Sequence, residues 1–220
     1  MNTIQVCTIT LDGKLYEREI PSFRGAVMGI AGNNPLFHNH SDEGDIHRYP
    51  RIQYKVIDGR PAVIGFEDGA DALCSLFLPA SKHVMKIGRI YREFVVAIVV
   101  KDSFLFPLKH GEMRRYTLHS WLPLNSDNYA AFMRMSSLSE RIAKLDEILT
   151  GNILSLYKGF HVYVEEHITA HIVDLTPRLV TFKGVKMSAF DAVIETDFAL
   201  PIHCGIGKGV SHGFGVIGKV

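Results

Sequence analysis

The sequence predicts an α+β fold class built from two successive units. Runs rich in β-branched residues alternate with helix-like amphipathic segments, and clusters of Gly, Pro, Asn and Asp separate them. The composition is that of an ordinary globular protein, because 47% of the 220 residues are hydrophobic, 21% are charged and the net charge is +1. It excludes extended disorder, a collagen-like fibre and a disulfide-stapled mini-protein. The length allows one large domain or two small ones.

The chain opens with a predicted strand and a predicted helix. Residues 3–11 (TIQVCTITL) favour a strand because β-branched side chains pack well on a pleated surface. A helix is expected to start at Pro21-Ser22 and to stop at the Gly-Asn-Asn-Pro cluster of residues 32–35. A polar loop rich in histidine follows this cluster.

The rest of the first half predicts a hairpin, a helix and a further strand. Residues 51–57 and 60–66 are short apolar runs joined by Asp58-Gly59, a strong hairpin signal. A helix capped by Asp68 is expected to run through Leu78, and residues 82–100 return to strand composition. The order β-α-β-β-α-β is that of a ferredoxin-like unit.

The second half predicts a similar but looser unit. A strand near residues 114–124 precedes a long helical region over 127–157, in which Ser137 to Glu140 form a partial capping pattern. Three strand-like runs follow, punctuated by Pro177 and Gly184, and they read HITAHIVDLT, LVTFKGVKMS and FDAVIETDFAL. We therefore expect two domains, residues 1–100 and 101–220, with the boundary near 100–112.

Cysteine usage and hydropathy predict a cytoplasmic protein with no membrane association. Cys7, Cys74 and Cys204 are odd in number, far apart and without C-x-x-C spacing, so they indicate neither a disulfide framework nor a cysteine zinc site. The N-terminal residues do not resemble a signal peptide, and the longest apolar run, residues 94–100, is too short to span a bilayer.

Basic residues concentrate between Lys82 and Arg115, where eight Lys and Arg stand against three acidic residues. Such a basic strip could follow a phosphate backbone. It could equally be a solvated strand face.

Residues 205–220 form a glycine-rich segment, GIGKGVSHGFGVIGKV. It can be overlaid on G-x-G-x-x-G and on most of a P-loop, but both motifs require a following helix, which the remaining residues do not predict. The segment is either an acid-free loop that lets backbone amides approach an anionic polymer or a hairpin with glycine bulges. The candidate contacts to such a polymer are Gly205, Gly207, Lys208, Gly209, Gly213, Phe214 and Gly215.

His38 and His40 are separated by one residue, so an extended backbone would place both imidazoles on the same side. Because unperturbed imidazoles titrate near pH ~6.5, one could act as base and the other as acid when a 2′-hydroxyl attacks the adjacent phosphorus. Tyr49 and Arg48 could stabilise charge on the phosphorane. Two alternatives remain: surface histidines without a role, and a metal site completed by Asp42, Glu43 and Asp45.

Five segments together resemble a known family. They are FRG at 23–25, FHNH at 37–40, HRYPRIQYK at 47–55, LTGNILSLYKG at 149–159 and GIGKGVSHGFG at 205–215. The chain resembles the CRISPR-associated endoribonucleases of the RAMP superfamily, which process repeat-containing precursor RNA. The resemblance implies tandem ferredoxin-like, RRM-related domains with a C-terminal glycine-rich loop.

The resemblance also implies an activity and its residues. It implies cleavage of CRISPR repeat RNA without a metal or other cofactor, giving a 2′,3′-cyclic phosphate and a 5′-hydroxyl. Its catalytic residues match His38, His40 and Tyr49, and its arginine-glycine of the first helix matches Arg24-Gly25. The implied partners are the repeat RNA, other CRISPR-associated effector subunits and a second copy of the chain. The alternative is a catalytically inactive repeat-RNA-binding protein of the same fold.

Further RNA contacts are expected from Arg48, Tyr54 and Lys55, because aromatic rings stack on bases and cations hold phosphates. A two-histidine cyclic phosphodiesterase is a weaker reading. That chemistry needs two H-x-T/S motifs, and His167-Ile168-Thr169 supplies one.

Overall fold

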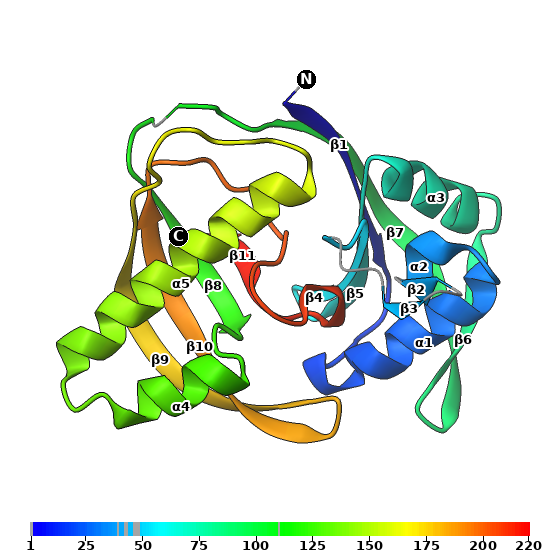
Figure 1. Ribbon diagram of the computed structural model, residues 1–220. Helices are drawn as coiled ribbons and strands as arrows, with labels where there is room; N and C mark the ends of the chain where they lie inside the picture. The colour runs from blue at the N-terminus through cyan, green and yellow to red at the C-terminus, as the bar shows by residue number, and fades with distance from the viewer. Residues whose placement is uncertain (1, 39, 42–43, 46–48, 110) are drawn as a thin grey trace. The chain divides into compact units, whose positions relative to one another are not determined.

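The computed structural model describes every residue except 1, 39, 42–43, 46–48 and 110. Internal contacts divide the chain into two compact units, each with its own antiparallel sheet and helices (Figure 1). The first unit contains Thr3–Leu105 and Ser211–Gly213, and the second contains Asn2, Phe106–Val210 and Phe214–Val220. The predicted α+β class is confirmed.

The first unit contains a five-stranded antiparallel sheet in the order β4-β5-β1-β7-β6. Its strands are β1 (Thr3–Leu11), β4 (Ile52–Ile57), β5 (Arg60–Phe66), β6 (Lys82–Ile87) and β7 (Ile90–Leu105). The order β4-β5-β1-β7 is that of the ferredoxin-like unit expected from the sequence, and β6 adds one edge strand to it.

Two tight turns shape this sheet. Asp58 and Gly59 have φ of 51° and 74°, as a two-residue hairpin turn requires, so the predicted β4–β5 hairpin is confirmed. The single strand region expected over 82–100 is wrong. The chain reverses after Gly88 (φ 65°), and Ile87 pairs with Ile90 to form a β6–β7 hairpin.

Helices α1 (Ile20–Ala31) and α3 (Asp68–Phe77) cover one face of the first sheet (Figure 1). Their buried residues recur at helical spacing, as expected for amphipathic helices on a core. They include Phe23 and Val27 of α1, and Leu73 and Phe77 of α3. Shorter elements complete the unit: the 3₁₀ helix η1 (Glu17–Glu19), α2 (Pro35–His38), β2 (His40–Ser41) and β3 (Gly44–Asp45).

The second unit contains a four-stranded antiparallel sheet in the order β11-β8-β10-β9. Its elements are β8 (Arg114–Trp121), α4 (Ser126–Arg134), α5 (Leu138–Gly159), β9 (Ala170–Phe182), β10 (Val185–Thr196) and β11 (Val216–Lys219). The 3₁₀ helix η2 (Val210–His212) begins in this unit at Val210 and continues into the segment Ser211–Gly213 of the first unit. Helix α5 lies across this sheet with Leu145, Leu149 and Ile153 buried (Figure 1). Among the described helices, none is both long enough and apolar enough to cross a membrane.

The long helical region expected over 127–157 forms two helices, α4 and α5. Ser137 caps α5 reciprocally with Glu140: its Oγ accepts from the Glu140 N–H at 3.1 Å, and its own N–H donates to the Glu140 carboxylate at 3.2 Å. This capping box starts a new helix rather than lying inside one.

The three strand-like runs expected over 167–200 form two strands, β9 and β10, joined by a turn at Lys183-Gly184. Pro177 lies within β9 instead of ending a strand. An edge strand tolerates proline because one side of its backbone needs no ladder hydrogen bond, and β9 is at the edge of the sheet.

Candidate active site

His38 is the last residue of α2, and its ring is held by a backbone carbonyl. Nε2 lies 2.7 Å from the carbonyl oxygen of Gly32. A carbonyl only accepts hydrogen bonds, so Nε2 must carry the proton and Nδ1 is the nitrogen that can take up another. Gly32 has φ 62° and ψ −139°, a conformation that L-residues rarely adopt, so glycine suits the position that presents this carbonyl.

Arg24 lies on α1 beside the end of α2. Its Nη2 donates to the carbonyl oxygen of His38 at 3.1 Å, and its guanidinium group lies 5.9 Å from the centre of the Tyr54 ring. The sequence predicts Arg24 as an RNA contact. The structure gives it a local partner, the backbone of His38 itself.

Tyr54 supports the same short helix from β4. Its hydroxyl donates to the carbonyl oxygen of Phe37 at 3.4 Å, and its ring packs edge-on against Phe23 with centroids 6.1 Å apart. Burial raises the pKa of Tyr54, so its phenol stays protonated. Arg24 and Tyr54 thus hold the last two carbonyls of α2.

His40 follows within two residues, as the first residue of β2. Its backbone pairs antiparallel with β3, opposite Asp45. Its side chain, like Arg48 and the candidate metal ligands Asp42 and Glu43, lies outside the described residues. The common facing of His38 and His40 therefore stays a prediction.

Tyr49 and Lys55 occupy different environments. Tyr49 is half-buried and packs edge-on against Phe66, with ring centroids 6.4 Å apart. Lys55 is fully buried in β4, and so is Tyr54. The sequence predicts RNA contacts for Tyr54 and Lys55, and the structure buries both side chains.

The glycine-rich segment is folded back on the second unit by positive-φ glycines. Gly207, Gly209 and Gly215 have φ of 82°, 76° and 61°. A Cβ at Gly207 would lie 2.7 Å from Oδ1 of Asn152, and one at Gly215 would collide with the carbonyl oxygen of Ile206. The segment leads into η2 and β11 rather than into a long helix, so neither a P-loop nor a dinucleotide-binding turn is present.

Gly205 and Gly213 take other positions. Gly205 forms an isolated bridge with Val216. Gly213 (φ 86°) belongs to the first unit, where an added Cβ would collide with the side chain of Ile20.

Two lysines and two aromatic rings gather in the second unit around Phe182; we call them the Phe182 cluster (Phe182, Lys183, Lys208 and Phe214). The Nζ atoms of Lys183 and Lys208 lie 5.9 and 5.8 Å from the centre of the Phe182 ring. Phe214 packs edge-on against that ring at 5.4 Å.

Sequence reasoning found two members of this cluster, Lys208 and Phe214, and missed Phe182 and Lys183. The missed residues stand at the tip of the β9–β10 hairpin and carry no motif. Gly209 permits the close packing, because a Cβ there would lie 2.9 Å from the Phe214 ring and 3.2 Å from the Phe182 ring.

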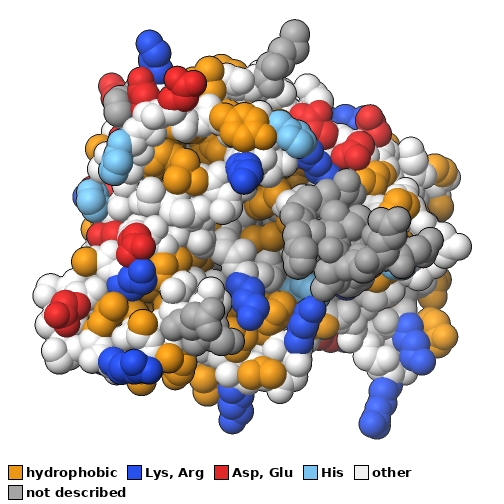
Figure 2. All heavy atoms as spheres, viewed as in Figure 1, with side chains coloured by type: hydrophobic (Ala, Val, Ile, Leu, Met, Phe, Trp, Pro, Cys, Tyr) orange, Lys and Arg blue, Asp and Glu red, His pale blue; other side chains and the backbone are white. Residues whose placement is uncertain are grey.

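The basic strip between Lys82 and Arg115 is partly neutralised. Lys82 pairs with Glu93 at 2.9 Å, Arg115 pairs with Glu195 at 2.6 Å, and Arg92 pairs with Glu19. Figure 2 shows Lys and Arg side chains dispersed among hydrophobic and neutral ones on the face in view. Three of the eight basic residues of the strip are thus paired with carboxylates.

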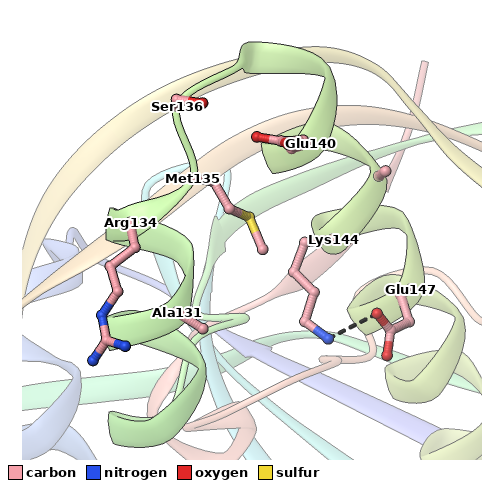
Figure 3. Close-up of a pocket in the computed structure, with 8 residues that line it drawn as sticks. Ala131, Arg134, Met135, Ser136, Glu140, Lys144 and Glu147 are labelled. Atoms are coloured by element: carbon pink, nitrogen blue, oxygen red, sulfur yellow. Dashed lines mark hydrogen bonds and ion pairs between the residues drawn. The ribbon is translucent and has the colours of Figure 1, made fainter.

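The open pocket of the second unit is lined by none of the predicted site residues. Among the described residues, no group of three or more His, Cys, Asp or Glu side chains could hold a metal ion. An open pocket of about 590 Å³ lies between α4 and α5, where Lys144 and Glu147 pair at 2.7 Å and Met135 points into the gap (Figure 3). Its lining residues are Ala131, Arg134, Met135, Ser136, Glu140, Ala143, Lys144 and Glu147.

Comparison with protein families covers nearly the whole chain. The Cas6b N-terminal domain model matches residues 2–101, and the Cas6b C-terminal domain model matches residues 109–220. The chain belongs to the Cas6b family. The resemblance to CRISPR-associated RNA-processing enzymes of the RAMP type, expected from the sequence, is confirmed.

Solved structures agree with this membership. A crystal structure of Cas6b is 27% identical to this chain with a TM-score of 0.88, and the match covers 99% of this chain and 100% of the other. A second, described as the CRISPR RNA processing endoribonuclease Cas6b, is 26% identical with a TM-score of 0.77 and the same coverage. A more distant type IV Cas6 crRNA endonuclease, Csf5, shares the fold at 10% identity and a TM-score of 0.63, over 99% of both chains.

Among curated sequences, an uncharacterized protein of Methanocaldococcus jannaschii is 31% identical over 134 residues. The match covers 60% of this chain and 89% of that protein. Together with the two antiparallel sheets, the structural matches confirm the predicted tandem ferredoxin-like fold.

Proposed function

We propose that this Cas6b-family chain is an endoribonuclease that cleaves CRISPR repeat RNA within precursor transcripts. The 2′-hydroxyl attacks the adjacent phosphorus without a metal ion, and the products carry a 2′,3′-cyclic phosphate and a 5′-hydroxyl. Family membership supports the substrate class, since one solved relative is described as a CRISPR RNA processing endoribonuclease. The hydrogen bond between His38 and Gly32 supports the acid–base chemistry.

This hydrogen bond favours His38 as the general base. With its proton fixed on Nε2, the neutral ring has its lone pair on Nδ1, which accepts the proton of the attacking 2′-hydroxyl. His40 then acts as the acid and gives its proton to the departing 5′-oxygen. Tyr49 and Arg48 stabilise the charge on the phosphorane.

The RNA is held mainly by cations, aromatic rings and backbone amides. Lys183 and Lys208 contact phosphate oxygens, and the half-buried ring of Phe214 stacks on a base. The glycine-rich segment brings its amides close to the backbone of the RNA. Arg24 acts first as a positioning residue for His38.

Two substrates test the reaction. The purified chain is incubated with repeat RNA in excess chelator, and separately with the same RNA carrying a 2′-deoxy residue at the cut site. We expect full cleavage in chelator and none of the deoxy RNA, which should still bind and inhibit. Cleavage of the deoxy substrate would contradict the proposed nucleophile. Loss of activity in chelator, restored by a divalent cation, would replace the histidine mechanism by a metal site.

The inactive RNA-binding alternative is tested by the double variant His38→Ala, His40→Ala. We expect its single-turnover rate to fall at least about 10³-fold while RNA affinity changes little. His167→Ala, which changes an exposed histidine in the second unit, is the matched control and should cleave like wild type. Equal product yields from the double variant and wild type would show that these histidines do not cleave the RNA.

Binding to other CRISPR-associated effector subunits and self-association remain predictions from the resemblance. Size-exclusion chromatography with light scattering, with and without repeat RNA, measures the second of these directly.

A further inference from the structure

Two cysteines that are far apart in the sequence meet in the first unit. Cys7 lies on β1 and Cys74 on α3, and their Sγ atoms are 3.6 Å apart. Both are free thiols. A disulfide bond is about 2.05 Å long, so the sulfurs need to approach by only about 1.5 Å.

The two thiols differ in accessibility. Cys7 is 1% exposed and belongs to the hydrophobic core between the sheet and its helices. Burial, together with the hydrogen bond to Cys74, raises the pKa of the Cys7 thiol to about 12. Cys74 is only half-buried and packs at the edge of that core, so reagents from solvent reach it first.

A cation accompanies the accessible sulfur. Lys101 lies on β7 directly opposite Cys7 in the sheet register, and its hydrogen bond with Cys74 raises the pKa of the Lys101 ammonium group. A cation at this position attracts the negative charge that a sulfur carries when it attacks a disulfide. Lys101 also favours the ionised form of Cys7.

We propose that Cys7 and Cys74 are a redox pair that forms an intramolecular disulfide between β1 and α3 by exchange with a low-molecular-weight disulfide. The Cys74 thiolate attacks the small disulfide, forms a mixed disulfide and releases one small thiol. The Cys7 sulfur then attacks the Cys74 sulfur and displaces the second small thiol. Two electrons pass to the small disulfide, and the two thiol protons end on the released thiols.

The bond would tie α3 to the central part of the first sheet, since β1 pairs with both β5 and β7. It closes a loop across 67 residues of sequence separation, which restricts the unfolded chain more than the folded one. A reversible gain in thermal stability is therefore the expected readout, and it is independent of RNA cleavage.

The test treats the full chain with oxidised glutathione, then measures intact mass, disulfide-linked peptides and melting temperature without reductant. We expect wild type to lose two hydrogen atoms, to yield one peptide linking Cys7 to Cys74, and to melt at least about 5 °C higher, reversibly. Cys204, the third cysteine, is also buried, and Cys204→Ala should behave like wild type. Cys74→Ser should show neither the bond nor the shift.

Three results would overturn the proposal: a stable glutathione adduct on wild type without the internal bond, a linked peptide that contains Cys204, or an unchanged mass. Cys7 is buried in the core, so Cys7→Ala is expected to destabilise the first unit, and Cys74→Ser is therefore the diagnostic variant.

A lysine substitution tests the role of Lys101 separately. Lys101→Gln should slow formation of the bond by roughly threefold to tenfold without changing the final linked peptide. Lys86→Gln, an exposed lysine of β6 in the same sheet, is the matched control and should leave the rate unchanged. Equal rates for all three proteins would show that Lys101 does not activate Cys74.

Discussion

At the scale of single residues, the orientation of His38 depends on Gly32, six residues earlier. The Gly32 carbonyl lies 2.7 Å from Nε2 and so decides which ring nitrogen is free to accept a proton. Arg24 and Tyr54 fix the carbonyls of His38 and Phe37 in turn. As the proposed general base, His38 needs such support, because small displacements of a reacting group reduce the rate steeply.

Gly32→Ala tests this support. The backbone conformation of position 32 costs an alanine about 1–3 kcal/mol. The chain should therefore shift locally and turn the carbonyl of residue 32 away from His38. We expect the single-turnover cleavage rate to fall by about tenfold or more, with RNA affinity nearly unchanged.

The matched control is Gly29→Ala in α1, the helix that Gly32 follows directly. The Cβ added at position 29 meets open space. It should raise the free energy of unfolding by about 0.5–1 kcal/mol and leave cleavage unchanged. A folded Gly32→Ala variant that cleaves at the wild-type rate would show that this carbonyl does not position His38.

Arg24→Ala separates positioning from RNA binding. Because Arg24 donates to the backbone of His38, we expect the cleavage rate at saturating RNA to fall by about tenfold, with a smaller change in Kd. Arg24→Lys should recover only part of the rate, since an ammonium group cannot reproduce the planar donor geometry. A raised Kd with an unchanged saturating rate would make Arg24 an RNA contact instead.

At the scale of elements, local sequence signals predict individual turns and caps, but the strand or helix that results also depends on its surroundings. The Asp58-Gly59 turn predicts its hairpin because the two positive φ angles suit Asp and Gly. The Ser137–Glu140 pattern predicts a cap, and in the structure this cap starts a new helix, although the helical periodicity continues on both sides of it. Pro177 predicts the end of a strand, but it lies inside β9. Whether proline ends a strand depends on the position of that strand in the sheet, and β9 is an edge strand.

Ser137→Ala should therefore destabilise the second unit. Loss of the capping box removes a side-chain acceptor for the Glu140 N–H, which we expect to lower the free energy of unfolding by about 1 kcal/mol in urea titrations. Ser155→Ala is the control on the same helix, because its exposed hydroxyl donates only to the carbonyl of Gly151. Equal effects of both substitutions would contradict a special role for the cap.

RNA binding through the Phe182 cluster should depend on salt concentration. Each phosphate contact made by a lysine releases condensed counterions, so Lys183→Ala and Lys208→Ala should each weaken RNA binding. Each should also reduce the slope of log Kd against log salt concentration by about 0.7.

Lys186→Ala is the control in the same hairpin, because Lys186 is exposed on β10. It should change neither quantity. If all three substitutions had the same effect, the hairpin would contribute general charge rather than defined phosphate contacts.

At the scale of the whole molecule, the chain consists of two units that each complete their own antiparallel sheet. The Cas6b family models also match two consecutive segments, residues 2–101 and 109–220. Two short pieces depart from this serial order: Asn2 belongs by its contacts to the second unit, and Ser211–Gly213 belongs to the first. The glycine-rich segment is thus divided between the two units, a feature that its composition does not reveal.

The sequence by itself determined the α+β class, the β4–β5 hairpin, the first helix and the family resemblance, because each depends on propensities or motifs within a short window. Only the tertiary structure decided that Lys55 is buried, that Lys183 joins Lys208 at one aromatic ring, and that Cys7 meets Cys74. These contacts join residues far apart in the chain. They depend on strand order and register, which local propensity does not encode.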